Sequence, residues 1–288
     1  DESAAGRPDL LKGNPRSLDL AKLGETLESA SPPVKGLMVW SANPAATQID
    51  GPRVKKGLMR DDLFTVVIDH FLTDTARYAD IVLPATTQFE HVDVQGAWGH
   101  HYVLANTAAI APMGEARSSG AIMRGLAATL GLDHPAFRES DEEIAATTMP
   151  QEFSFAELCQ DGWRKSPTPR PVLAPLEAKL RLGNGPLAPP PAADQESLQL
   201  ITPKSHYFLN STFANMPRNR KSQGAPTATL HPNEAKSRDL AAGDRVALRR
   251  NGVKVDVTLA VSDTVREGVV TLDEARIPVV LLDRDVTP

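Results

Sequence analysis

The runs Leu63-Phe64-Thr65-Val66-Val67-Ile68 and Ile81-Val82-Leu83 decide the fold. Each is short, rich in β-branched residues and ended by an aspartate or a proline, which is typical of strands buried in a parallel sheet. Gly36 to Trp40 has the same character. Helical patterns separate or follow these strands, from Thr73 to Asp80 and from Gly120 to Leu132. This alternation predicts an α/β domain built on a doubly wound parallel sheet.

Beyond the middle of the chain the pattern changes to that of a β domain. Asn251-Gly252 is the dipeptide most typical of a tight β-hairpin turn. A small helix is expected from Pro232 to Arg238, since proline is favoured in the first turn. The expected strands are Leu198–Ile201, Val246–Leu248, Val253–Leu259 and Gly268–Leu272. We interpret this half as a compact, barrel-like β domain.

A proline-rich segment separates the two halves. We expect an α/β domain over residues 1–165, a connector over 166–193 and a β-barrel domain over 194–288. Prolines stiffen a chain and cannot extend a helix or a central strand, so the segment fits an interdomain linker. Its prolines are Pro167, Pro169, Pro171, Pro175, Pro186 and Pro189 to Pro191.

Composition excludes several classes of protein. The net charge of the 288 residues is -5, with acids and bases interspersed and no basic block, which argues against a nucleic-acid partner. No apolar run approaches the ~20 residues that span a bilayer, so we expect no membrane span. The single cysteine, Cys159, excludes a disulfide framework, a cysteine-rich zinc site and an iron–sulfur cluster held within this chain alone.

Two polar residues follow predicted strands. Asn43 and Asp69 come where ligands bind in an open parallel sheet, beyond the carboxyl ends of its strands. Asp69 could accept N–H groups from a guanine edge or hydroxyls from a ribose, and the start of the helix at Thr73 could face a phosphate. The alternative is structural, with Asn43 capping a turn and Asp69 a solvated strand end.

Other polar residues also allow more than one interpretation. His100 and His101 near Glu90 suggest zinc, but adjacent histidines diverge and their segment is loop-like, which favours structural or surface roles. Glu90 and Arg117 could form a structural ion pair or contact a ligand. A lone histidine such as His206 is more often a satisfied structural group than a ligand contact.

Longer phrases carry a specific resemblance. Val39–Ala46 (VWSANPAA) and Thr73–Thr87 (TDTARYADIVLPATT), followed by Glu90, resemble the third domain of the molybdopterin oxidoreductases, which include formate dehydrogenases, nitrate reductases and dimethyl sulfoxide reductases. Glu115–Ser118 (EARS) is similar to the family's next segment, and Ser205–Phe213 (SHYFLNSTF) to the opening of its cofactor-binding barrel. The resemblance covers roughly Arg7 to Leu272.

The resemblance implies a barrel of the double-psi type and a bis-molybdopterin-guanine-dinucleotide cofactor carrying molybdenum or tungsten. In the complete enzyme it implies two-electron transfer of an oxygen atom or a hydride, performed by the cofactor. It places four residues around the guanosine and pyrophosphate groups: Asn43, Asp69, Thr75 and Arg117. It places four more near the pterin and phosphate groups: Lys204, His206, Asn210 and Ser211.

The chain also departs from the family. It has neither the N-terminal cysteine cluster nor the region that supplies the metal ligand, so any iron–sulfur cluster belongs to a missing N-terminal region and we expect the isolated chain to be inactive. Ser119 stands where the family usually has Asp or Asn. After Leu272 the expected pterin-contacting pattern is absent, which predicts an incomplete barrel.

These departures leave alternatives open. The chain could be a non-catalytic scaffold of the same fold in a larger redox complex, or a degraded gene product that does not fold stably. We expect its partners to be the remainder of the oxidoreductase subunit and electron-transfer subunits. We expect a cytoplasmic location, with the periplasm as the alternative, because enzymes of this type can be exported already folded.

Overall fold

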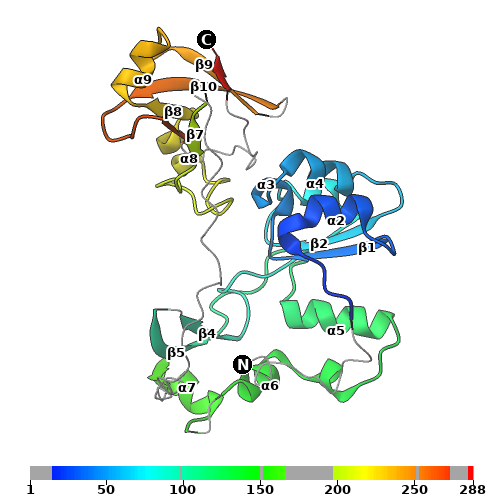
Figure 1. The fold of residues 1–288 in the computed structure, drawn as a ribbon. Coiled ribbons are helices and arrows are strands. Elements are labelled where there is room, and N and C mark those ends of the chain that lie inside the picture. Colours follow the sequence, from blue (N-terminus) through cyan, green and yellow to red (C-terminus); the bar gives the residue numbers. More distant parts are fainter. Residues whose placement is uncertain are drawn as a thin grey trace, which may run out of the picture. The chain divides into compact units, whose positions relative to one another are not determined.

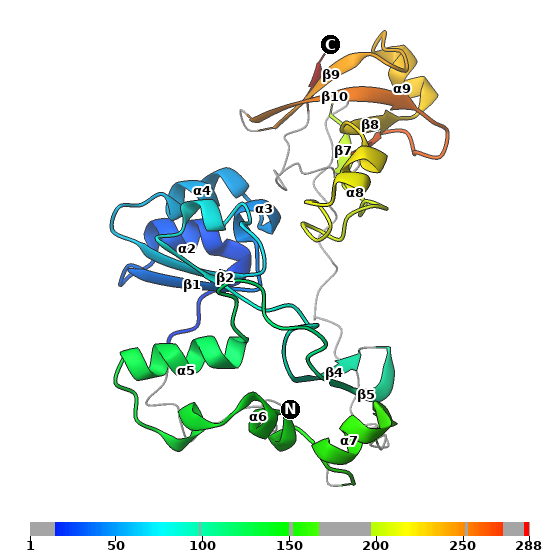
Figure 2. The ribbon, with the colours of Figure 1, turned by 180° about the vertical axis from the view of Figure 1, so that it is seen from behind.

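The computed structural model describes residues 15–97, 99–149, 152–166, 197–250, 253–272 and 285–287. The strands in this part of the chain form three sheets, drawn in Figures 1 and 2, and each is described by itself. Most of the predicted connector, residues 167–193, lies outside the described residues.

The first sheet has the order β1-β2-β3, with β1 over Gly36–Trp40, β2 over Phe64–Asp69 and β3 over Ile81–Pro84. β2 and β3 are parallel, and Asp69 pairs with Pro84 at their carboxyl ends. The three predicted strands are therefore confirmed. The central strand β2 buries Thr65, Val67 and Ile68, although Phe64 is 53% exposed. The edge strands are more open: Trp40 of β1 is 51% exposed and Ile81 of β3 is 45% exposed. The predicted burial of β1 and β3 is wrong on this point.

Two helices of this region pack against each other. α2 (Leu23–Ser29) and α4 (Gly51–Leu58) lie side by side in both ribbon views (Figures 1 and 2). A Cβ atom added at Gly57 would lie 2.6 Å from the Cβ of Leu27, whose side chain is 1% exposed. The glycine thus allows the close approach of the two helices. The short helices η2 (Leu20–Lys22) and α3 (Pro44–Thr47) complete this part.

The helix predicted from Thr73 to Asp80 is wrong in length. Only one 3₁₀ turn forms, η3 (Ala76–Tyr78), although the Thr73 hydroxyl does accept a hydrogen bond from the Ala76 N–H at 3.2 Å. β3 begins at Ile81 and leaves no room for a second turn. Threonine and aspartate also bond to nearby backbone in non-helical conformations, which weakens a helix this short.

The next predicted helix is confirmed as α5 (Ser119–Thr129). Ser118 caps it by accepting a hydrogen bond from the Ala121 N–H at 3.1 Å. Ile122 of α5 packs with Ile68 of β2 and with Ala85 in a small buried core. Three further helices follow: η4 (Pro135–Arg138), α6 (Asp141–Thr147) and α7 (Phe155–Asp161).

The second sheet overturns one expectation. The segment around His100 was expected to be a loop, but it is strand β5 (His100–Asn106), which pairs with β4 (Asp93–Ala97) and with β6 (Trp163–Lys165). Leu104 of β5 lies opposite Trp163, far away in the sequence. A local pattern does not reveal such distant pairing, because strand preference depends on cross-strand neighbours.

The third sheet forms a curled half-barrel. Its order is β12-β9-β10-β8-β11-β7, with parallel and antiparallel neighbours. The predicted strands are confirmed as β7 (Gln199–Ile201), β9 (Arg245–Arg250), β10 (Val253–Val261) and β11 (Val269–Leu272), and the predicted helix as α9 (Pro232–Ser237). Sequence analysis missed α8 (Pro217–Gln223), β8 (Thr227–Leu230) and β12 (Asp285–Thr287).

The inner face of this sheet forms the largest core described. Leu230 of β8, Val257 of β10 and Leu272 of β11 are each at most 2% exposed and belong to one hydrophobic cluster. The turn dipeptide Asn251-Gly252 lies outside the described residues, but the strands on either side of it pair antiparallel, Arg250 opposite Val253. The hairpin pairing is thus as predicted.

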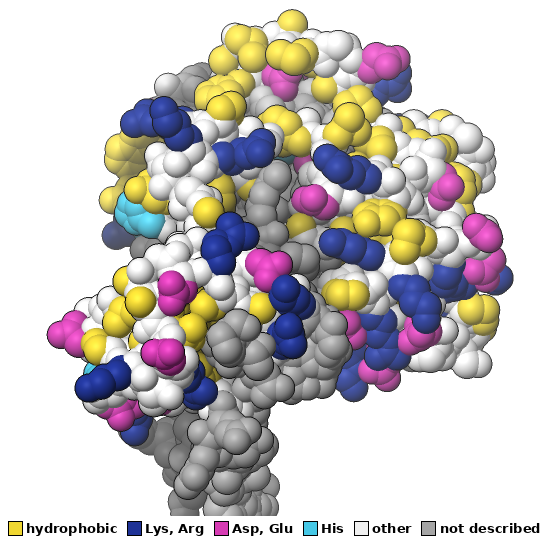
Figure 3. All heavy atoms as spheres, turned by 90° about the horizontal axis from the view of Figure 1, so that it is seen from above, with side chains coloured by type: hydrophobic (Ala, Val, Ile, Leu, Met, Phe, Trp, Pro, Cys, Tyr) yellow, Lys and Arg dark blue, Asp and Glu magenta, His cyan; other side chains and the backbone are white. Residues whose placement is uncertain are grey.

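Charged side chains of both signs are interspersed with apolar ones on the face drawn in Figure 3. This agrees with the mixed charge pattern along the sequence. Among the described residues, no helix combines the length and apolar character needed to cross a membrane.

Substitution of Gly57 by alanine tests the packing of α2 on α4. Overpacking against Leu27 costs roughly 1–3 kcal/mol, which outweighs the ~1 kcal/mol that alanine gains over glycine in a helix. We predict that Gly57→Ala lowers the free energy of unfolding in urea. Gly125→Ala in α5 is the matched control, because no atom lies within 4 Å of its added Cβ. The control should be neutral or stabilising; equal effects of the two substitutions would contradict the close packing.

Candidate functional site

The carboxyl ends of the strands in the first sheet are tied together by backbone hydrogen bonds. After β1, the Ser41 N–H donates to the Ile68 carbonyl at 3.0 Å, and after β3 the Ala85 N–H donates to the Asp69 carbonyl at 3.1 Å. The segment holding Arg117 then adds a parallel bridge to Ala85. The structure therefore aligns the chain at this edge, where ligands bind in open α/β sheets.

Asp69 has one carboxylate oxygen engaged and one available. Its Oδ1 accepts the His70 N–H at 2.7 Å and the Phe71 N–H at 3.3 Å, so it fixes the turn that follows β2. No described residue donates to its Oδ2. The side chain is half-buried at the edge of the sheet. It can accept further N–H or O–H donors without loss of the turn.

Arg117 has a fixed backbone and a free side chain. Its N–H donates to the Pro84 carbonyl at 3.1 Å and its carbonyl accepts the Thr86 N–H at 3.0 Å. Its exposed guanidinium makes no ion pair or hydrogen bond within the described part of the chain. A cation held in this way is suited to an anionic ligand.

The other two residues predicted for this region are more buried. Asn43 precedes α3 and is 8% exposed, and its carbonyl accepts the Ala46 and Thr47 N–H groups at 3.0 Å. Thr75 precedes η3 and is 0% exposed. Both have partners within the chain. Their contact with a ligand stays a prediction.

In the half-barrel, the loop after β7 holds the other four predicted residues. Lys204 Nζ donates to Asn210 Oδ1, which brings these two side chains together. Asn210 has the left-handed φ of 53° and Leu209 pairs with Thr212 through two backbone hydrogen bonds of 3.2 and 2.9 Å, so the loop turns tightly. Ser211, within this turn, is half-buried.

His206 lies in the same loop and is exposed. Its ring contacts the Tyr207 ring edge-to-face, with centroids 5.1 Å apart. Neither ring nitrogen has a hydrogen-bond partner among the described residues. The Ser205 hydroxyl accepts the Tyr207 and Phe208 N–H groups at 3.0 and 3.2 Å, which fixes the backbone around His206. Its imidazole is therefore available to donate or accept.

Glu90 is a structural carboxylate. It is 7% exposed and accepts hydrogen bonds from the Thr87 N–H at 2.7 Å, the Thr87 hydroxyl at 2.8 Å and the Met113 N–H at 2.6 Å. The donors at Thr87, followed by the one at Met113, hold the pKa of the Glu90 carboxyl below its ordinary value. Both oxygens are used, so the suggested ion pair with Arg117 does not form.

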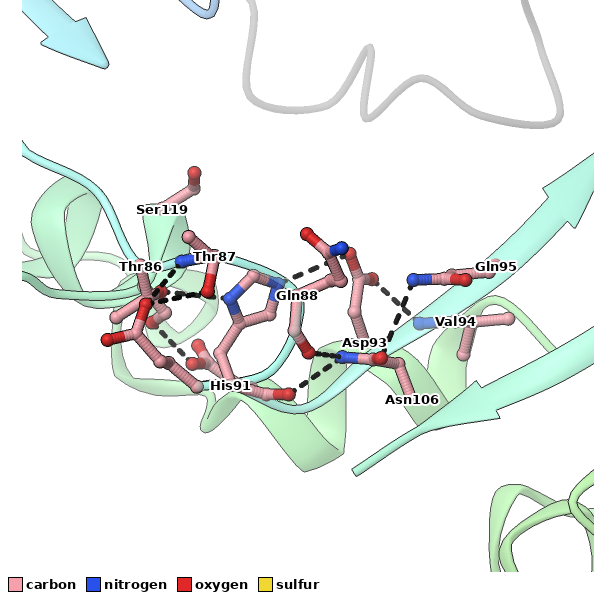
Figure 4. Close-up of polar contacts among 12 residues, drawn as sticks. Thr86, Thr87, Gln88, His91, Asp93, Val94, Gln95, Asn106 and Ser119 are labelled. Atoms are coloured by element: carbon pink, nitrogen blue, oxygen red, sulfur yellow. Dashed lines mark hydrogen bonds and ion pairs between the residues drawn. The ribbon is translucent and has the colours of Figure 1, made fainter. Parts of the chain in front are cut away.

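A polar residue that sequence analysis missed supports the loop between β3 and β4. The Asn106 side-chain amide donates to the carbonyls of Gln88 and His91 at 2.7 and 2.8 Å (Figure 4). His91 Nδ1 also lies 2.8 Å from the Thr86 hydroxyl. No predicted strand or motif around Asn106 indicated this role. The side chains fix the loop that begins at the carboxyl edge of β3.

The histidines considered for zinc lie on successive positions of β5. His100 and His101 therefore point to opposite faces of the sheet. In the ranges that the structure describes, no group of three or more His, Cys, Asp or Glu side chains is placed to hold a metal ion. Cys159, on α7, is exposed.

Substitution of Glu90 by glutamine tests its role as a tie between loops. A carboxyl whose folded pKa is lowered stabilises the fold above its unfolded pKa, and that stability is lost as the pH falls through the folded pKa. We predict that Glu90→Gln lowers the urea midpoint at neutral pH, and that the gap to the unsubstituted chain narrows below the ordinary pKa of 4.5. A gap that is constant with pH would contradict this role.

The control is Glu152→Gln. Glu152 is exposed and has no hydrogen bond or ion pair among the described residues. The Glu152→Gln substitution removes the same charge, but Glu152 lacks the three hydrogen-bond donors that surround Glu90. The urea midpoint of this variant should therefore stay close to that of the unsubstituted chain at neutral pH.

Comparisons with known proteins match the regions described above. Residues 18–129 match the molybdopterin oxidoreductase family, and residues 198–278 match the molydopterin dinucleotide binding domain. The chain is 33% identical to "Probable oxidoreductase YoaE" of Bacillus subtilis (strain 168), over 93% of this chain and 43% of that protein. It is 30% identical to the biotin sulfoxide reductase of Cereibacter sphaeroides, over 82% of this chain and 38% of that protein.

A solved structure supports the fold. Acetylene hydratase from Pelobacter acetylenicus superposes with a TM-score of 0.73 at 22% identity, over 89% of this chain and 39% of that one. The chain thus spans about two fifths of the length of these relatives. The first matched segment holds Asp69 and Arg117, and the second holds the loop of Lys204 and His206. The chain belongs to the molybdopterin oxidoreductase family, and its residues 198–278 match a molybdopterin dinucleotide-binding domain.

Proposed function

We propose that this chain holds a molybdopterin guanine dinucleotide for an oxidoreductase, with the guanosine end at the carboxyl edge of β1, β2 and β3. The observation that carries the proposal is the Asp69 carboxylate, which keeps one oxygen for the turn and one for a ligand. A guanine edge presents adjacent N–H donors that match a carboxylate. We propose separately that the half-barrel contacts pterin and phosphate groups of a bis-molybdopterin-guanine-dinucleotide cofactor, and we assign it the double-psi topology by its resemblance to the family.

The donor set around these positions fits a group that is both anionic and rich in hydrogen-bonding edges. At the strand edge, Arg117 offers an exposed guanidinium for a phosphate, and we propose that Asn43 and Thr75 shape the pocket from within. Arginine suits phosphate because its fork of N–H donors matches two oxygens at once.

In the half-barrel loop, the chemistry of several polar side chains fits a pterin and a phosphate. His206 has free ring nitrogens, Asn210 and Ser211 offer an amide and a hydroxyl, and Lys204 offers an ammonium group. Amides and hydroxyls match the edges of a heterocycle, and an ammonium group matches a phosphate as a point charge. Because Ser205 and the Asn210 turn fix the backbone, these groups would meet the ligand with little loss of conformational entropy.

The bound cofactor, with molybdenum or tungsten, would supply two-electron transfer of an oxygen atom or a hydride, while the residues above hold and orient it. Relatives named biotin sulfoxide reductase and dimethyl sulfoxide/trimethylamine N-oxide reductase support the oxygen-atom alternative. The metal ligand and any iron–sulfur cluster would come from the remainder of the oxidoreductase, with electron-transfer subunits as further partners. We propose that this chain is inactive alone, and that it works in the cytoplasm, with the periplasm as the alternative.

Asp69→Asn tests the guanosine site. Asparagine can keep Oδ1 as the acceptor in the turn but replaces the second oxygen with an N–H donor. Hydrogen bonds to charged groups contribute roughly 1.5–3 kcal/mol, so we predict that guanosine diphosphate binds about tenfold more weakly or worse. Xanthosine diphosphate, which has a carbonyl where guanine has an amino group, should instead bind better. Isothermal titration calorimetry measures both affinities.

Asp61→Asn is the control, because Asp61 is exposed and has no side-chain partner among the described residues. It should leave both affinities unchanged. Unaltered preference for guanosine over xanthosine in Asp69→Asn would contradict the assignment of the guanine edge to Asp69.

A further inference from the structure

The sheet β4-β5-β6 has one covered face and one open face. Successive side chains of a strand alternate between the two faces, and paired residues share a face. On the covered face, Arg164 Nη1 lies 3.8 Å from Glu157 Oε1 of α7, and the guanidinium lies over the Phe153 ring, 5.5 Å from its centroid. Val94 and Val103 on this face are half-buried. α7 lies beside β5 in both ribbon views (Figures 1 and 2), so this helix covers the face.

The open face carries large apolar side chains where polar ones are expected. An antiparallel sheet with one solvated face normally places apolar residues on the covered face and polar residues on the other. On the open face, Tyr102 is 39% exposed, Leu104 38% and Trp163 56%. Leu104 pairs with Trp163, and Tyr102 precedes Leu104 by two positions, so the three share this face. Contiguous exposed apolar side chains of this kind mark binding surfaces.

These three side chains and His100 line a hollow of about 320 Å³, which we call the aromatic hollow. The Tyr102 ring meets the His100 ring edge-to-face with centroids 5.4 Å apart, and the Trp163 ring in the same way at 5.2 Å. Small-molecule sites are concave, mostly apolar and rich in aromatic side chains, with volumes of roughly 300–1,000 Å³. The aromatic hollow therefore suits a small ligand with a flat ring, which packs on the faces or edges of other rings.

Two polar groups beside Tyr102 favour an anionic ligand. The Tyr102 N–H donates to His100 Nδ1 at 3.1 Å, so the neutral imidazole carries its proton on Nε2, which is a free donor among the described residues. Lys165 pairs with Tyr102 across the strands and therefore lies on the open face. Its ammonium group is exposed and has no ion pair or hydrogen bond in the part of the chain that the structure describes.

The nearby carboxylates do not neutralise Lys165. Asp161 and Glu157 pair with Arg164 on the covered face. Asp93 of β4 is on the open face but pairs with Asn106, four residues beyond Tyr102 and thus roughly 13 Å along the strand. Asp93 also lies 3.8 Å from His91 Nε2. The aromatic hollow is therefore flanked by a cation and an N–H donor.

We propose that the aromatic hollow binds a flat aromatic ring that carries an anionic group, such as an aromatic carboxylate. The ring packs against Tyr102 and Trp163, and the anionic group contacts Lys165 and the Nε2–H of His100. The site uses no residue assigned to the cofactor, so it goes beyond the proposed function and does not depend on it.

The test compares the affinities of three probes for the purified chain by isothermal titration calorimetry. Naphthoate has an aromatic ring and an anionic group, naphthylmethylammonium replaces the anion with a cation, and cyclohexanecarboxylate keeps the anion without an aromatic ring. We expect naphthoate to bind at least about tenfold more tightly than either of the other probes, the effect of ~1.4 kcal/mol. Absence of naphthoate binding at millimolar concentrations, or equal affinity for naphthoate and either other probe, would overturn the inference.

Two substitutions locate the binding. Trp163→Ala removes a wall of the aromatic hollow and should weaken naphthoate binding at least about tenfold. Lys165→Gln removes the cation and should weaken it about threefold, and this loss should shrink at high salt because exposed charges are screened. If Trp163→Ala does not fold, Lys165→Gln decides the inference, because the Lys165 side chain is exposed and its loss should leave the urea midpoint unchanged.

Trp40→Ala and Lys22→Gln are the matched controls. Trp40 is 51% exposed on a different sheet, and Lys22 is exposed and has no ion pair among the described residues. Both variants should keep the naphthoate affinity within about twofold. Losses in the controls as large as those in Trp163→Ala and Lys165→Gln would show a general apolar or charge effect and overturn the inference.

Discussion

The backbone hydrogen bonds across the carboxyl edge of the β1-β2-β3 sheet are the constraint on which the proposed guanosine site depends. Ser41 bonds to the end of β2, and the Asp69 carbonyl bonds to the residue after β3. These bonds hold the carboxyl ends of the strands together, so the side chains that follow the strands extend from a fixed backbone. Glu90 then ties the following loop to Met113 through its buried carboxylate. Positions held in this way need little reorganisation when a ligand binds.

In the half-barrel, hydrogen bonds from side chains, instead of backbone bonds between strand ends, fix the loop after β7. Ser205 fixes the loop backbone, and Asn219 and Gln223 attach α8 to it. The groups that hold the loop backbone are thus distinct from the His206 ring, which we propose contacts the ligand. In both regions, one set of polar groups fixes the backbone and a different set is proposed to contact the ligand. A binding site whose backbone is fixed in this way is preorganised.

Local patterns in the sequence predicted the helices and strands that depend on local interactions. β2, β3 and α5 were correct because each has a clear apolar period and a distinct stop or cap. β5 was missed because its stability comes from pairing with β6, far away along the chain. The helix at Thr73 was overestimated because the start of β3 limits its length.

The candidate site divides in the same way. Asp69 was predicted because it follows a strand, and the loop of Lys204 and His206 because its phrase resembles the family; their contact with a ligand stays a prediction. The side chains of Asn106 and Asn219 donate to backbone carbonyls of loop residues that are distant in the sequence. No spacing in the sequence therefore indicated these roles. The most direct measurement is the ligand content of the natural protein purified from its host, with guanosine monophosphate and oxidised pterin quantified after hydrolysis. We predict both in equal amounts; pterin without guanosine monophosphate, or a folded protein with neither, would contradict a guanine dinucleotide-binding role.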